Sequence, residues 1–379
     1  MIFEIDSSIS NFLKNETGNR DLTMKCLKKV EALLLNASDG KNVIFFEDIE
    51  IIESLIDCGK FSEPTGYFLE YLRENFASTG SFIELTSRHI KIVLECEPEI
   101  IINDKNHTIV TLPISKLDQS FFGKSVLLTE NLVDGKFYKR ITQCYCNNCG
   151  QNIDFDFELK HGGGHTTGTV FNETFSNKDK NCLCIVDSDK SHPECNCKET
   201  AKAVVTEYNN SDIAKFISDY YILEVKEAEN LIPQEVVDKI IAPQLIDNLD
   251  IYKKLSNKGA QFFDCKKGIN RKFLIKTRDT KKLNFWKEEL QGIDNNAEQI
   301  FSNINDNPTN CTGICNECPN KSCRQLYWGG IGNKILDNSI ENINKNEHYS
   351  LRENIQKEWE TIAKKIITWS IVQPEYRFM

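Results

Sequence analysis

The sequence predicts an α/β protein in which a parallel sheet flanked by helices lies between two mostly helical regions. Two apolar runs, residues 125–129 and 182–186, have the length and composition of buried strands. Helix-like stretches at 134–142 and 169–175 lie between the strand candidates, and such alternation is typical of parallel pairing. Both apolar runs end directly before acidic residues, which indicates where a functional site would lie.

Residues 1–120 are predicted to form a mostly helical N-terminal domain. Apolar residues recur at helical spacing between positions 21 and 37, and 67–76 is typical of a second helix. No catalytic motif is found in this region. We therefore interpret it as a packing or partner-binding domain.

Residues 121–235 are predicted to form the central α/β domain, with further strands at 153–159 and 220–225 and a glycine-rich loop at 161–165. Right-handed crossovers place the C-terminal ends of parallel strands along one edge of a sheet, where ligands bind in open α/β folds. The acids that follow the strands and the glycine-rich loop are expected to meet at that edge.

Residues 236–379 are expected to be helical, with a final helix at 351–371, and to be interrupted by a basic segment and a cysteine cluster. The whole chain has a net charge of −10, which argues against nucleic-acid binding by the entire surface. Residues 253–287 carry a net charge of +10, which leaves −20 for the rest. This segment either grips a phosphate backbone or is a solvated surface. The residues predicted to bind nucleic acid are Lys266, Lys267, Arg271 and Lys272.

The N-terminus lacks the features of a secretion signal, and no apolar run is long enough to cross a bilayer. We expect a cytoplasmic protein with no membrane partner. The fifteen cysteines are then expected to be reduced, some of them holding metal, because many stand at short metal-ligand spacings.

Three carboxylates follow the two buried strands: Glu130 comes after the first, and Asp187 and Asp189 come after the second. Hard oxygen ligands of this kind suit Mg²⁺ or Mn²⁺, which can polarise a phosphate and activate water. Aspartates also commonly close strands as turn residues, so the pair alone is a weak signal. The three acids together predict a divalent metal site.

This arrangement resembles the TOPRIM domain of primases, topoisomerases, RecR-type repair proteins and OLD-type nucleases. The likeness rests on residues 129–134, the glycine cluster and residues 185–189. Residues 137–138 and the motif at 227–230 resemble the TOPRIM proteins of bacterial anti-phage systems, such as the AriB nuclease of PARIS.

The resemblance implies a metal-dependent endonuclease acting on DNA or RNA, an effector of anti-phage defence. It makes Glu130 a metal ligand or general acid/base, Asp187 and Asp189 metal ligands, and Glu227 or Glu229 supports of the site. Further candidates are Asp134, which as a helix N-terminal acid has an equally good structural explanation, and His161 and His165, which are either phosphate contacts or inert.

Two other functions stay open at this point. One is a RecR-like module that binds nucleic acid through TOPRIM and zinc without cutting it. The other is a toxin subunit held inactive by a partner. Because the chain has no Walker A loop, an ATPase or sensor would be a separate subunit. A homo-oligomer is also compatible with the sequence.

Four cysteines within 13 residues predict a structural zinc site near the C-terminus. Their first three positions are similar to the iron–sulfur motif of radical SAM enzymes, but only 56 residues follow the last cysteine, which argues against that fold. An ordinary iron–sulfur cluster stays an alternative. The four residues are Cys311, Cys315, Cys318 and Cys323.

A second group of cysteines lies around the central strands, and whether it binds another metal stays open. In the predicted fold a single site would have to cross the sheet, and the two cysteines of the strand at 182–186 are better explained as core residues. The group comprises Cys144, Cys146, Cys149, Cys182, Cys184, Cys195 and Cys197, with His192.

Overall fold

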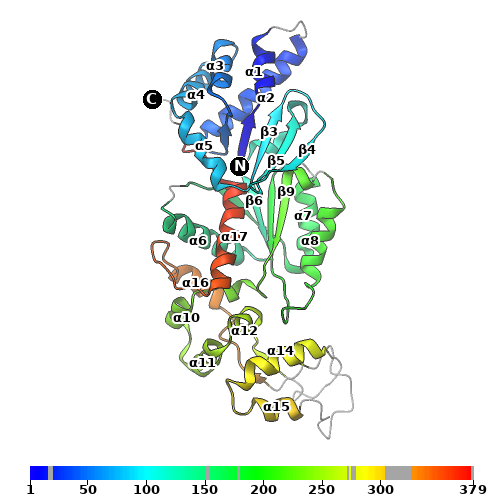
Figure 1. Cartoon of the computed structure of the whole chain (residues 1–379), viewed down its shortest axis with the longest axis vertical. Helices are drawn as coiled ribbons and strands as arrows, with labels where there is room; N and C mark the ends of the chain where they lie inside the picture. Colours follow the sequence, from blue (N-terminus) through cyan, green and yellow to red (C-terminus); the bar gives the residue numbers. More distant parts are fainter. Residues whose placement is uncertain are drawn as a thin grey trace.

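The protein is an α/β structure with two parallel-dominated sheets flanked by helices, arranged one above the other along the long axis (Figure 1). The computed structural model describes residues 1–15, 20–150, 153–176, 180–212, 214–270, 273–274, 279–303 and 326–376. None of the helices in these ranges combines the length and apolar character needed to span a membrane.

The N-terminal region contains a five-stranded sheet of order β2-β1-β3-β5-β4, in which only β4 runs antiparallel to its neighbour. The sequence predicts a mostly helical region here and does not predict this sheet, so that prediction is wrong. The region does also contain helices. The elements are β1 (Ile2–Ile5), α1 (Ser7–Lys14), α2 (Arg20–Ser38), β2 (Val43–Phe45), α3 (Ile49–Asp57), α4 (Glu63–Glu74), α5 (Phe76–Leu85), β3 (Arg88–Val93), β4 (Glu99–Ile102) and β5 (Thr108–Pro113).

The central region forms a four-stranded, fully parallel sheet of order β7-β6-β8-β9. The two inner strands have the predicted bounds and are buried along their whole length, as expected for strands covered on both faces. The elements are β6 (Ser125–Thr129), α6 (Leu132–Asn148), β7 (Phe157–His161), α7 (Thr167–Ser176), β8 (Cys182–Val186), α8 (Glu199–Asn209), α9 (Ala214–Ile217) and β9 (Ser218–Ile222).

Strand β7 begins at Phe157, four residues later than the sequence predicts. The alternating segment 153–159 is divided between two partners. Phe157 pairs with β6, whereas Phe155 forms a bridge with Ile371 in the segment after the last helix. Strand β9 is likewise shifted, because it pairs with β8 over 218–222 and not over the predicted 220–225.

The C-terminal region is mostly helical, and its last helix returns to the central sheet. The elements are α10 (Gln234–Ile240), α11 (Ile246–Lys254), α12 (Asn257–Phe262), β10 (Ile269–Asn270), α14 (Thr280–Gln291), α15 (Ala297–Asn303), β11 (Leu326–Trp328), α16 (Ile335–Asn342) and α17 (Glu353–Ser370). Helix α17 packs against α6 and against strands β6 and β8, as Figure 1 shows. Helices α7 and α8 pack together beside the same sheet.

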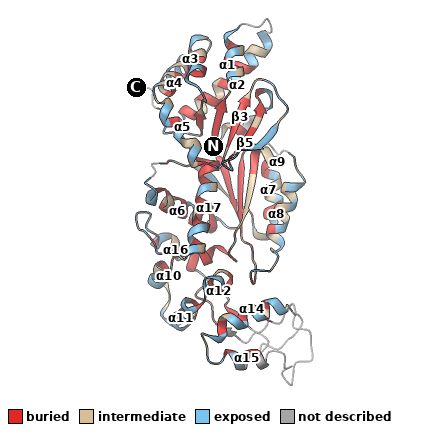
Figure 2. Ribbon diagram, viewed as in Figure 1, coloured by how far each residue is buried: buried red, intermediate tan, exposed pale blue. Residues whose placement is uncertain are grey.

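The segment after α17 joins the two sheets. The Val372 amide donates to the Asp154 carbonyl beside the central sheet, and the Tyr376 amide donates to the Ser38 carbonyl of α2. The Met1 ammonium donates to the Ile371 carbonyl at 2.6 Å, and burial lowers its pKa to about 5. Figure 2 shows that buried residues continue from the upper sheet into the lower one along this junction.

Candidate functional site

The candidate site lies where strands β6, β8 and β9 of the central sheet end. The chain leaves β6 through α6 to reach β7 on one side, and α7 then brings it to β8 on the other side of β6. The carboxyl ends of β6 and β8 therefore form a topological switch point, where a crevice opens in sheets of this kind. Glu130 directly follows β6, and Asp187 directly follows β8.

Hydrogen bonds connect the three strand ends in series. The Asp187 backbone N–H donates to Glu130 Oε1 at 3.2 Å, and the Ala228 N–H donates to Asp187 Oδ1 at 3.2 Å. Each carboxylate thus binds the backbone of the next strand's terminal loop, and the structure brings Glu130, Asp187 and the 227–229 turn together.

Asp134 fixes the turn that carries Glu130. Its Oδ2 accepts the Asn131 N–H at 3.0 Å within a capping box at the start of α6. This is the structural role that a helix N-terminal acid commonly has. Asp134 is also buried close to the other carboxylates, and it contributes to the raised pKa of Asp187.

The turn after β9 presents two further acids, Glu227 and Glu229, both buried. The Asn230 side chain accepts the Glu227 N–H at 3.0 Å and donates to the carbonyls of Ala260 and Phe263 at 2.8 and 2.9 Å. One amide side chain therefore connects the acidic turn to the last turn of α12 and to the residue that follows it.

Two lysines pair with the acids of this turn. Lys266 Nζ, from the segment after α12, lies 2.8 Å from Glu229 Oε1 and 3.6 Å from Glu227 Oε2. Lys226 Nζ lies 3.4 Å from Glu227 Oε2 and 3.0 Å from Asp264 Oδ2. The Lys266 ammonium, predicted to contact nucleic acid, is thus engaged with the carboxylates.

The neighbouring residues of the predicted basic grip have different positions. Lys267 is exposed, and its backbone N–H donates to Asp264 Oδ1. Arg271 and Lys272 lie outside the described residues. The nucleic-acid role of all four residues stays a prediction.

The two lysines do not fully balance the negative charge of the carboxylate cluster, which consists of Glu130, Asp134, Asp187, Asp189, Glu227 and Glu229. Burial, with the nearby charges of Asp134, Glu130 and Glu229, raises the pKa of Asp187 well above its usual range. Burial and the charge of Asp189 raise the pKa of Glu130 to about 7.

Two further acids of the cluster share this effect. Burial raises the pKa of Asp134 to about 6 and also raises the pKa of Glu227. In addition, Glu227 Oε1 is buried without a hydrogen-bond partner in the described part of the structure. The cluster therefore has surplus negative charge that a cation would neutralise, and an oxygen atom that could serve as its ligand.

Whether these residues suit a metal ion depends on their ligand atoms and on their arrangement. Among the described residues, no group of three or more His, Cys, Asp or Glu side chains is arranged as a metal site. The available donors are nevertheless carboxylate oxygens, which Mg²⁺ and Mn²⁺ prefer, and one of them lacks any partner within the described ranges. The chemistry of the residues fits such an ion, and the Lys266 ammonium lies beside two of the acids that would be available to it.

Asp189 has a left-handed backbone, with φ of 51°. Aspartate tolerates this conformation better than most residues, and the Asp189 N–H donates to the Lys226 carbonyl at 2.9 Å. The turn places its charge close enough to raise the pKa of Glu130.

The glycine-rich loop lies against the same edge, but two of its amides are already used. The Gly162 N–H donates to the Thr129 carbonyl and the Gly163 N–H to the Glu130 carbonyl. These bonds hold the loop against the end of β6 and leave neither of the two N–H groups available to a phosphate. His161 and His165 are exposed beside it, so their predicted phosphate contact stays a prediction.

The second cysteine group is dispersed. Cys182 and Cys184 are buried in β8, as predicted for core residues, and Cys144 and Cys146 are buried in α6. Burial raises the pKa of all four thiols.

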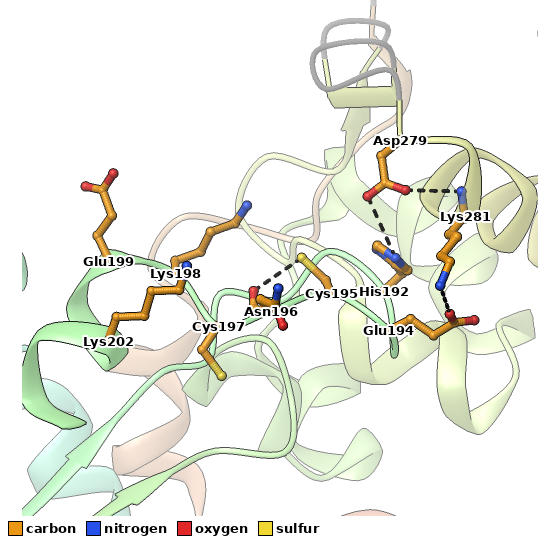
Figure 3. A pocket seen from close by; sticks show the side chains of 10 residues that line it. All are labelled: His192, Glu194, Cys195, Asn196, Cys197, Lys198, Glu199, Lys202, Asp279 and Lys281. Carbon is orange, nitrogen blue, oxygen red and sulfur yellow. Dashed lines mark hydrogen bonds and ion pairs between the residues drawn. The ribbon is translucent and has the colours of Figure 1, made fainter. Parts of the chain in front are cut away.

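Cys195 and Cys197 line a pocket of about 380 Å³ beside the loop that follows Asp189 (Figure 3). At this pocket, His192 Nε2 lies 3.8 Å from Asp279 Oδ2. The Trp286 indole N–H of α14 donates to the Ser191 carbonyl nearby. No metal-ready cluster of three His, Cys, Asp or Glu residues occurs here or elsewhere in the ranges that the structure describes.

The predicted zinc ligands Cys311, Cys315, Cys318 and Cys323 lie outside the described residues. We expect the purified protein to contain about one zinc per chain, because four cysteines at this spacing are typical of structural zinc. Metal analysis by mass spectrometry tests this. Iron together with a visible charge-transfer absorbance would favour the iron–sulfur alternative, and a metal-free protein would contradict both.

No protein-family model matches this chain, and comparisons with curated proteins and with solved structures likewise found no match.

Sequence reasoning assigned no role to three residues around the site, which are Lys226, Asn230 and Glu358. Glu358 of α17 accepts the Glu224 N–H at 2.9 Å and the Tyr221 hydroxyl at 3.0 Å, and so fixes the chain between β9 and the acidic turn. Burial raises the pKa of Glu358 to about 7. Lys226 directly precedes Glu227 and Asn230 closes the motif at 227–230, whereas Glu358 had no local signal.

Proposed function

We propose that the carboxylate cluster holds Mg²⁺ or Mn²⁺ and that the protein is a metal-dependent endonuclease that hydrolyses phosphodiester bonds. The observation that supports this most is the group of buried and half-buried acids at the switch point, with surplus negative charge around Asp187 and a Glu227 oxygen that has no hydrogen-bond partner among the described residues. Such a concentration of charge is costly unless a ligand compensates for it.

Glu130, Asp187 and Asp189 are the proposed ligands, with Glu227 and Glu229 in support. When bound, the ion would polarise a phosphate oxygen and lower the pKa of an attacking water. Glu130 is the proposed ligand or general base: burial and the charge of Asp189 raise its pKa to about 7 when no metal is bound, and a bound ion would favour its ionised form. Lys266 extends from the segment after α12, and its ammonium, paired with Glu229, reduces the negative charge that a bound phosphate would meet.

The resemblance to TOPRIM proteins of anti-phage systems supports nucleic acid as the substrate and a defence effector as the role. A separate ATPase or sensor subunit belongs to this proposal as the regulating partner.

The proposal is tested by incubating the purified chain with Mg²⁺ or Mn²⁺ and plasmid, single-stranded DNA or total RNA including tRNA. Cutting that requires the metal and disappears with a chelator is the expected result. Binding without cutting under all these conditions would instead support the RecR-like alternative. Neither binding nor cutting would contradict both.

A second test needs no activity. The raised pKa of Glu130 means that the folded, metal-free protein holds this proton more tightly than the unfolded chain does. Its contribution to stability is present below its unfolded pKa of about 4.5 and is lost as pH rises towards 7. We expect Mg²⁺ to raise the melting temperature clearly at pH 8 and little at pH 5.5. An equal effect at both values would contradict metal binding by these acids.

Lys266 and Lys267 form a matched pair of neighbouring lysines. We expect Lys267→Met to reduce the slope of the logarithm of the binding constant against the logarithm of the salt concentration by about one unit. The exposed Lys267 side chain would then account for one phosphate contact. Lys266→Met should leave that slope nearly unchanged and reduce the cutting rate at saturating substrate by roughly 10-fold or more, since it removes a charge next to Glu229. Equal salt slopes and equal rates for the two variants would contradict these separate roles.

A further inference from the structure

Strand β4 is an exposed, apolar strand at the free edge of the N-terminal sheet (Figure 1). All four of its residues are exposed, and the exposed fractions of Ile100, Ile101 and Ile102 are 39%, 44% and 64%. Natural sheet edges are usually protected by charge, proline or a covering element, and an open apolar edge is a template for another strand. This edge therefore calls for a partner strand.

The backbone of β4 has groups directed outward. The Asn103 N–H donates to the His107 carbonyl of the hairpin that leads into β5, so Asn103 forms a hydrogen-bonded pair. In an antiparallel ladder these pairs alternate, which makes Ile101 the next hydrogen-bonded residue towards β5. The N–H and C=O groups of Ile100 and Ile102 consequently face away from the sheet.

One apolar row of side chains also runs to this edge. Ile44, Phe3, Ile90, Val110 and Ile100 lie side by side across the five strands. Ile44, Phe3, Ile90 and Val110 are buried, and Ile100 ends the row in solvent.

We propose that β4 pairs antiparallel with β4 of a second copy of this chain and joins the two five-stranded sheets into one. In the register we infer, Ile101 faces Ile101 of the second copy on the two-fold axis. Ile100 then faces Ile102, so the outward backbone groups of both copies are paired and the apolar row continues across the interface.

One pair of opposite charges favours this self-pairing, although acids outnumber the single lysine around β4. The same register sets Glu99 opposite Asn103 and brings Glu97 towards Lys105 in the hairpin turn of the second copy. Pro98 has no N–H and limits the ladder at one end, and the turn after Asn103 limits it at the other. Because the same edge is used in both copies, the assembly closes as a dimer.

The short edge implies a weak dimer. Pairing of four residues in each copy buries less than the roughly 1,200 Å² of a standard interface, so we expect a dissociation constant of about 1–100 µM. Sedimentation velocity of the full chain over roughly that concentration range should show a reversible shift from monomer to dimer.

Two substitutions test the strand and its register. Ile101→Lys places two ammonium groups together on the axis and should weaken the dimer at least 10-fold, about 1.4 kcal/mol. The control is Ile246→Lys, which changes an isoleucine of similar exposure on α11 and should leave the dimer intact. Melting curves confirm that both variants fold.

Ile101→Cys should form a disulfide-linked dimer on mild oxidation beyond any seen with the native cysteines, because residues of a non-hydrogen-bonded antiparallel pair lie about 4.5 Å apart at Cα, within disulfide range. Ile102→Cys should do so less, since it faces Ile100. A protein that stays monomeric over the whole range, a dimer unaffected by Ile101→Lys, or equal cross-linking at both positions would overturn the proposal. These results are independent of nuclease activity.

Discussion

Asp187→Asn is expected to abolish cutting while leaving the protein folded. Asp187 lies between the ends of β6 and β9, and burial together with the charges of the neighbouring acids raises the pKa of its carboxyl group well above its usual range. Asparagine keeps the oxygen that accepts the Ala228 N–H but removes the charge that a metal needs. We expect the rate to fall at least about 100-fold, because even the outer partners of metal ligands are worth 10–100-fold.

The same change should stabilise the protein when no metal is present. A raised pKa means that the ionised form of Asp187 is disfavoured in the folded state, so a neutral side chain relieves this cost. We expect the metal-free variant to gain on the order of 1 kcal/mol in free energy of unfolding at pH 8.

Glu224→Gln is the matched control, because Glu224 is an exposed acid a few residues before the acidic turn. It should change neither rate nor stability appreciably. Cutting by Asp187→Asn at the original rate would contradict the proposed site, and lost activity together with lost stability would indicate a structural role only.

Asn230→Ala is expected to have the largest effect on stability of the changes considered. Alanine would leave the Glu227 N–H and the carbonyls of Ala260 and Phe263 without their side-chain partner. Buried groups that lose a partner cost about 1–3 kcal/mol each, so we expect a loss of roughly 2–4 kcal/mol in urea unfolding.

The local effect of Asn230→Ala distinguishes it from general destabilisation. Asn230 joins the acidic turn to the segment that carries Lys266, so hydrogen exchange should increase first at residues 226–230 and 260–266. The control is Asn342→Ala, which removes one exposed helical contact. Uniformly faster exchange throughout the chain would show that Asn230 has no special role in the site.

The two inner strands of the central sheet could be predicted because their amino-acid composition reflects their burial. Strands β6 and β8 are buried on both faces, so their residues are continuously apolar and their ends were predicted correctly. The acids at those ends followed from the sheet's parallel topology. Strands β7 and β9 lie at the sides of this sheet, and their bounds depend on pairing partners that the local pattern does not reveal.

The N-terminal sheet was missed because long-range contacts compensate for its polar residues. Strand β3 contains His89 and Lys91, and both contact Glu4 of β1, at 2.9 and 2.6 Å. The alternation of β3, with Ile90 and Ile92 buried on either side of Lys91, extends over only a few residues and does not identify the neighbouring strands. The match between distant charges appears only when the strands are placed side by side.

The same reason explains what was missed at the candidate site. Glu227 and Glu229 were found through a motif, whereas Lys266 and Asn230 act across about thirty or more residues of intervening sequence. Lys266 could be placed in a basic segment, but not next to two acids. The predicted zinc ligands stand outside the described residues and stay a prediction.

The return of α17 and the following segment has a consequence for biosynthesis. All four strands of the central sheet leave the ribosome before α17 does, yet α17 covers two of them, and its Glu358 holds the chain that leads to the acidic turn. The later residues 371–376 then fasten this sheet to the N-terminal one. The nascent chain therefore carries an uncovered sheet until residues 353–376 have left the ribosome, and we expect a ribosome-bound chain stalled before residue 353 to be sensitive to protease and unable to cut nucleic acid.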